Sequence, residues 1–165
     1  MSGLMDGFQA WAACDGEPRH KALKLECSVS GPADPEEIEA AWPGQVPDPE
    51  AVRLWVECRE AFLFRDVDYG QWGLQLLPPN RSSARTAAEL SERPSDFRAG
   101  DIVLGEFLGD QELLVLAPSE VGTRRILVAL PLDPRLEWYA GGENLATFFR
   151  QYLDVCGDKF WEQIA

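Results

Sequence analysis

The sequence is poor in the residues from which catalytic and metal sites are most often built. One of its 165 residues is a histidine, His20, and none of its four cysteines belongs to a C-x-x-C pair: Cys14, Cys27, Cys58 and Cys156. A structural zinc site needs clustered cysteine and histidine ligands. We interpret the cysteines as small buried hydrophobic residues and His20 as a solvated loop residue. We therefore expect neither a metal nor a cofactor.

The motifs of common nucleotide-binding and hydrolase sites are also missing. The sequence has no GxxxxGK[ST] phosphate loop, no GxGxxG after a strand and no GxSxG turn around a serine. No run approaches the ~20 apolar residues of a membrane helix. The first apolar stretch, residues 8–14, lacks the basic start and the length of a signal peptide. We expect a cytoplasmic protein with no membrane partner and no catalytic residue.

Paired carboxylates are the catalytic option that the sequence leaves open. Asp66 and Asp68 lie close together, and Asp110 and Glu112 fall in an expected hairpin loop. Two neighbouring carboxyl groups can perform acid–base chemistry when their surroundings separate their pKa values. They can also hold a divalent cation. In so acidic a chain such neighbours arise by chance, so a carboxylate-based enzyme is the third of three functional hypotheses.

Negative charge dominates the composition. Twenty-eight acidic residues against fifteen lysines and arginines give a net charge of −13 at pH 7. Residues 34–70 contain ten acids and three bases, and residues 101–120 contain five acids and no base. This charge opposes nucleic acids and anionic membranes as partners and would steer a basic protein toward the acidic surface. Taken alone, the acidity is explained more simply by solubility.

Two helix starts of the form Asp-Pro-Glu open the patterned part of the chain, at Asp34 and Asp48. Each places a carboxylate at the helix N-cap and a proline in the first turn. We expect a short helix that stops at Pro43-Gly44 and a longer helix from Asp48 to about Arg65, with one broad apolar stripe. The first 33 residues form a weakly patterned N-terminal arm.

A sheet and a closing helix are expected in the remainder. Strand patterns occur at residues 23–27, 72–77, 102–107, 113–117, 126–130 and 136–139. A short helix is indicated at 86–93 within a polar, turn-rich segment, and Gly109-Asp110 fits a hairpin. Residues 145–156 form an aromatic helical face that Gly157 ends. The expected fold class is α+β: a single domain with a largely antiparallel sheet of about five to six strands, covered by N-terminal helices and a C-terminal helix.

Aromatic residues near acidic strand ends are candidates for contacts with a partner. Trp72 and Trp138 are interpreted as core residues, because large aromatic side chains are mostly buried. Tyr69 and Tyr139 each combine an aromatic ring with a polar tip beside acidic residues, a combination typical of interface hot spots.

The order of the expected elements is similar to that of a known family. After an acid-rich short helix, the chain reads "VPDPEAVRLWVECREAFLF", "DIVLGEFLGDQELLVL", "RRILVALPLDPRLEWY" and "ENLATFFRQYLDVCGDKFWEQ". Over about residues 34–163 this resembles the SMI1/KNR4 family of the SUKH superfamily, so residues 34–165 are expected to form such a domain. The chain departs from it at Phe64-Arg65-Asp66, where many members have Asn-Gly. The resemblance implies a bacterial immunity protein that inhibits toxins, often nucleases, or, as in fungal relatives, a regulatory scaffold. It implies no catalytic residue.

Charge and resemblance lead to one hypothesis. The chain is a non-catalytic binding protein, a bacterial immunity protein that neutralises a cognate toxin such as a basic nuclease, whose cationic cleft would accept carboxylates. A regulatory scaffold that binds an endogenous protein is the second hypothesis. The expected partner-binding residues are Asp66, Asp68, Tyr69, Asp110, Glu112 and Tyr139.

Overall fold

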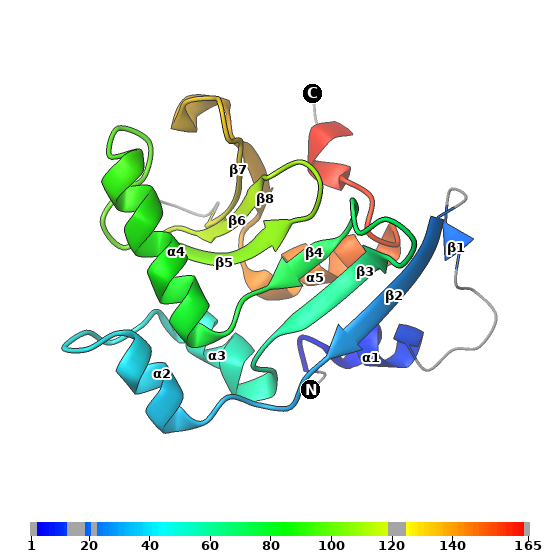
Figure 1. The fold of residues 1–165 in the computed structure, drawn as a ribbon, viewed down its shortest axis with the longest axis horizontal. Helices are drawn as coiled ribbons and strands as arrows, with labels where there is room; N and C mark the ends of the chain where they lie inside the picture. The colour runs from blue at the N-terminus through cyan, green and yellow to red at the C-terminus, as the bar shows by residue number, and fades with distance from the viewer. Residues whose placement is uncertain (1–2, 13–18, 21–22, 119–124, 164–165) are drawn as a thin grey trace.

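The computed structural model describes residues 3–12, 19–20, 23–118 and 125–163 (Figure 1). Within these residues, eight strands form an antiparallel sheet in chain order, β1 to β8. They are β1 (Arg19–His20), β2 (Leu23–Val29), β3 (Ala61–Asp66), β4 (Leu74–Leu76), β5 (Ile102–Phe107), β6 (Leu113–Leu116), β7 (Ile126–Ala129) and β8 (Tyr139–Gly142). The α+β class and the antiparallel sheet are confirmed, and the sheet has more strands than the five to six expected.

Helices cover the sheet on both faces. They are α1 (Asp6–Ala12), α2 (Pro35–Ala41), α3 (Pro49–Glu57), α4 (Pro79–Glu92) and α5 (Leu145–Asp154), with 3-10 turns η2 (Arg135–Glu137) and η3 (Phe160–Gln163). Helix α5 lies behind the sheet in Figure 1, and α4 lies in front of its β5 side. Leu104 and Leu114 enter the larger core, which includes α5, whereas Val103 and Val115 enter a smaller core beside Leu90 of α4. Alternate residues thus serve two cores, which explains why the central strands are apolar almost throughout.

The second expected helix is shorter than the sequence indicated. Helix α3 ends at Glu57, Cys58 is extended, and strand β3 begins at Ala61, so the expected end at about Arg65 is wrong. The apolar residues after Cys58 fit a helical stripe, but in the structure they form strand β3, whose backbone pairs with β2 and β4. Such tertiary override of a local pattern is common for short apolar runs.

Helix α4 is longer than expected because its proline start was interpreted as the end of a strand. It begins at Pro79 rather than Thr86 and has 14 residues, and proline suits the first turn of a helix. Ser82 donates a hydrogen bond to the Val103 carbonyl oxygen (2.5 Å), and the Val103 amide donates to the Thr86 hydroxyl (2.9 Å). Strand β4 ends at Leu76, so these two buried hydroxyls bond the β5 backbone where no strand partner continues.

The strand expected at residues 136–139 is displaced toward the C-terminus. Residues 135–137 form the 3-10 turn η2 after Pro134, and β8 starts at Tyr139. Strands β5, β6 and β7 and helix α5 are confirmed close to their expected bounds. Helix α5 ends at Asp154 with Val155 as its C-cap, before the expected end at residue 156, so Gly157 is not its cap. Gly157 follows at φ +86°, where an added Cβ would lie 2.6 Å from the Cβ of Phe64.

Part of the N-terminal arm belongs to the core, which its weak pattern did not predict. Leu4, Met5 and Phe8 are buried, and the Phe8 ring centroid lies 5.8 Å from those of Phe64 and Phe149. The strand expected at residues 23–27 is confirmed as β2. The structure places the backbone of His20 in β1 rather than in a loop, and Cys14 lies outside the described residues.

Candidate functional site

Two hairpins and the C-terminal segment meet at one end of the sheet (Figure 1). We call this region the acidic end and define it as residues 67–73, 108–112 and 158–162. The first hairpin joins β3 to β4 and the second joins β5 to β6, and β4 pairs with β5 through Leu74 and Phe107. The Leu108 amide donates a hydrogen bond to the Gly73 carbonyl oxygen at 2.8 Å, so the hairpins are in direct contact.

The close approach of the hairpins depends on Gly109. Its φ is +92°, and an added Cβ would lie 2.2 Å from the Gln71 carbonyl oxygen. Only glycine combines that backbone conformation with that proximity at low cost. The hairpin expected at Gly109-Asp110 is therefore present, and it packs against the first hairpin through its glycine.

Lys159 joins the C-terminal segment to the second hairpin. Its ammonium group pairs with Asp110 and, at 2.5 Å, with Glu112, and it lies 5.5 Å from the Trp72 ring centroid. The Lys159 side chain is 12% exposed, so its charge is used within the molecule. The partners of Lys159 lie 49 and 47 residues away in the chain, so local spacing in the sequence does not indicate Lys159 as a site residue.

Burial and ion pairing act on the protonation of this group in opposite directions. Burial raises the pKa of the Glu112 carboxyl, and hydrogen bonding to Lys159 opposes that rise without cancelling it. Burial alone would lower the pKa of Lys159, but its bonds to Asp110 and Glu112 outweigh this and raise that pKa above its ordinary value. The Lys159 charge therefore persists at neutral pH, and Glu112 serves to anchor Lys159.

Three of the expected partner-binding residues are exposed at the acidic end. Asp68 and Tyr69 stand on the first hairpin, with Tyr69 78% exposed, and Asp110 is exposed on the second hairpin. An exposed aromatic ring that follows an exposed carboxylate in the chain offers both apolar contact area and negative charge to a partner.

The other three expected residues are placed differently. Asp66 and Glu112 are buried, which corrects their expected position on the surface. The Asp66 carboxylate accepts a hydrogen bond from the Asp68 amide at 3.0 Å and thereby shapes the hairpin. Tyr139 lies on β8, pairs with Val128 and is half-buried against the larger core, outside the acidic end.

A groove of about 600 Å³ lies elsewhere, between the α2–α3 loop and α4. Trp42, Val46, Leu90 and Pro118 contribute to its lining, and none of the six expected partner-binding residues lines it. Its walls are mainly neutral, in contrast to the acidic end.

In the described part of the chain, no three histidine, cysteine, aspartate or glutamate residues are grouped so that they could hold a metal ion. No helix among the described residues has the length and apolar character needed to cross a membrane. No protein-family model matches the chain, and no curated protein matches its sequence.

Proposed function

We propose that this chain is a non-catalytic binding protein whose acidic end contacts a basic protein, and that it acts in bacteria as an immunity protein that neutralises a cognate toxin. The observation that carries the proposal is the unbalanced charge of the acidic end. Its three segments contain five carboxylates, on Asp68, Asp110, Glu112, Asp158 and Glu162, and one cation, Lys159. Because Lys159 is only 12% exposed and is paired with both Asp110 and Glu112, the surface offered to a partner is negative.

Such a surface fits the chemistry of a basic enzyme. Nucleases hold phosphates in cationic clefts, and carboxylates complementary to such a cleft increase the association rate and exclude wrong partners. Tyr69 would supply a ring with few rotatable bonds, which costs little entropy on ordering. The two hairpins are fixed to each other and to the C-terminal segment, so little of the surface needs to order on binding.

The resemblance of residues 34–163 to the SMI1/KNR4 family supports a toxin as the partner, because its bacterial members are mostly immunity proteins. A regulatory scaffold of the kind found among its fungal members would use the same surface on an endogenous protein, so a test must separate toxin from scaffold.

Co-expression provides that test. The product of the adjacent gene is expressed in a bacterial host alone and together with this chain, and host survival and complex formation are scored. We expect the neighbour to kill alone and to be neutralised in a stable one-to-one complex. A harmless neighbour that forms no complex would contradict the toxin and favour the regulatory scaffold.

A further inference from the structure

Two leucines on the loop between β7 and β8 are almost fully exposed. Leu132 is 94% and Leu136 is 93% exposed, although both are large apolar residues within a five-residue stretch. Single exposed leucines are ordinary on protein surfaces. Two exposed leucines on one loop are less ordinary, and the hydrogen bonds around the loop indicate why they are exposed.

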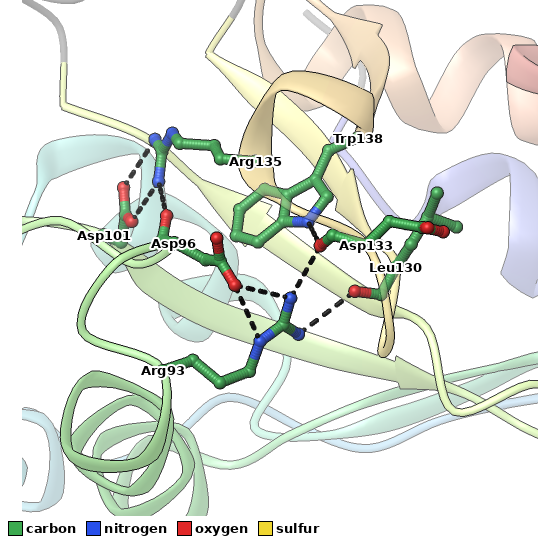
Figure 2. A network of polar contacts seen from close by, with 7 residues as sticks. All are labelled: Arg93, Asp96, Asp101, Leu130, Asp133, Arg135 and Trp138. Atoms are coloured by element: carbon green, nitrogen blue, oxygen red, sulfur yellow. Dashed lines mark hydrogen bonds and ion pairs between the residues drawn. The ribbon is translucent and has the colours of Figure 1, made fainter.

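Arg93 fixes the first half of this loop from the end of α4 (Figure 2). Its guanidinium donates hydrogen bonds to the carbonyl oxygens of Leu130 (3.0 Å) and Asp133 (2.8 Å), on either side of Leu132. The Trp138 indole nitrogen also donates to the Asp133 carbonyl oxygen, at 3.1 Å. The backbone that carries Leu132 is thus held in place while its side chain remains in solvent.

Arg135 fixes the second half of the loop, as Figure 2 also shows. It donates to both carboxylate oxygens of Asp101, at 2.6 and 3.1 Å, and to the Asp96 carbonyl oxygen at 3.0 Å. Leu136 follows directly in the chain. Both leucines are therefore presented on a preorganised loop, and a partner that buried them would pay little to order it.

The loop lies at the same end of the sheet as the acidic end. In an antiparallel sheet in chain order, the β3–β4, β5–β6 and β7–β8 connections all lie at the same end of the strands, as Figure 1 shows. Four strand spacings of ~4.8 Å separate the first connection from the third, roughly 19 Å. A standard protein interface of about 800 Å² per partner is roughly 30 Å across, so one partner can cover both.

The charge around the leucines has the same sign as the acidic end. Arg93 is paired with Asp96, and Arg135 is paired with Asp101. The carboxylates of Asp133 and Glu137 are exposed, and no cation of the described segments forms an ion pair with either. A second copy of this chain, with its own charge of −13, would be repelled, as would an anionic membrane.

We propose that the β7–β8 loop is the second half of the partner-binding surface, with Leu132 and Leu136 as anchors that enter an apolar pocket rimmed by lysine or arginine side chains. This inference rests on the proposed function, because it assigns these anchors to the same basic protein that the acidic end contacts. The acidic end accelerates association, and the leucines slow dissociation.

The test measures binding of the purified product of the adjacent gene to three forms of this chain: wild type, the double variant Leu132→Ser/Leu136→Ser, and Val46→Ser. Val46 is the matched control. It is 95% exposed on the α2–α3 loop, in the connection from β2 to β3 at the opposite end of the strands. Because all three side chains lie in solvent, we expect the same melting temperature for each form. We expect the double variant to bind at least tenfold more weakly, mainly through faster dissociation, and Val46→Ser to bind within twofold of wild type.

Each other outcome is decisive. If the double variant bound as tightly as wild type, the leucine anchors would be overturned and the proposed function would stand. The same would follow if Val46→Ser lost as much affinity as the double variant. Failure of the wild-type chain to bind would overturn both proposals. Sedimentation that showed a wild-type dimer, dissociated by the double variant, would identify a second copy as the occupant and overturn the basic partner.

Discussion

Arg135 donates hydrogen bonds to both carboxylate oxygens of Asp101, and no part of that Asp101 side chain is exposed to solvent. The Arg98 amide donates to the same carboxylate at 2.7 Å. The pair thereby joins the turn before β5 to the loop before β8, two segments 34 residues apart in the chain. A planar guanidinium makes such a two-pronged contact, whereas a lysine cannot.

Replacing Arg135 tests the importance of this pair for stability. Arg135→Met leaves the Asp101 carboxylate buried without its cation, so we expect the free energy of unfolding in urea to fall by about 3 kcal/mol. Arg98→Met, which removes an exposed side chain, is the control and should change it by less than about 0.5 kcal/mol. Equal effects of the two variants would contradict the role assigned to the pair.

Lys159 provides a second test, in which pH matters. Lys159→Met leaves Glu112 buried without a cation, and we expect a loss of about 2 kcal/mol at pH 7. The pKa of Glu112 is already raised and should rise further in the variant. When the pKa of a carboxyl group is higher in the folded than in the unfolded state, the protein becomes less stable as the pH rises from the unfolded pKa to the folded pKa.

The deficit of Lys159→Met should therefore shrink as Glu112 becomes protonated on the acidic side of that window. Urea unfolding of variant and wild type between pH 4 and pH 7 measures it. Lys24→Met, at an exposed lysine, should show no such trend. A deficit that is constant with pH would contradict the coupling of Lys159 to Glu112.

The hydroxyl of Thr86 is expected to contribute through the strand rather than through its own helix. It accepts the Val103 amide and donates to the Ser82 carbonyl oxygen at 2.8 Å. Thr86→Val keeps the shape but leaves the Val103 amide without a partner, which should cost about 1–3 kcal/mol in unfolding free energy. Thr86→Ser retains the hydroxyl and should recover most of that loss. If both variants were equally unstable, packing rather than hydrogen bonding would explain the residue.

Cys27 and Cys58 should be chemically inert in the folded protein. Burial raises the pKa of each thiol to about 12, and the thiolate is the reactive form. At pH 8 we expect an alkylating reagent to leave both unmodified until denaturant is added, as read by mass spectrometry of peptides. Rapid modification of either one under native conditions would contradict its burial.

Elements with a strong local signal were predictable from the sequence. Continuous apolar runs identified β5 to β7, and the aromatic period of residues 145–156 identified α5. The end of α3 was not predictable, because apolar residues such as Leu63 and Phe64 suit a helix stripe and a buried strand equally. The predicted helix at 86–93 was shorter than α4. Ser82 and Thr86 resemble turn residues in the sequence, and only the structure shows that their hydroxyls bond the backbone of Val103.

The candidate site was predictable only where hairpins exposed its residues. Asp110 falls in the expected Gly109-Asp110 hairpin, Asp68 and Tyr69 fall between the expected helix and the next expected strand, and all three lie on the surface. A local pattern does not show which carboxylates turn inward, so Asp66 and Glu112 were also expected on the surface. The burial of Glu112 depends on Lys159, a partner too distant in the chain to be read from spacing.

The central claim is that the acidic end steers a basic partner, and association kinetics test it most directly. The association rate with the product of the adjacent gene is measured against ionic strength for wild type, Asp68→Lys and Glu39→Lys. Both substitutions reverse one exposed carboxylate. Glu39, however, lies on α2, in the connection from β2 to β3 at the opposite end of the strands. We predict that Asp68→Lys slows association several-fold at low salt and flattens its salt dependence, while Glu39→Lys has a much smaller effect. Equal rates for the two variants would contradict the placement of the partner at the acidic end.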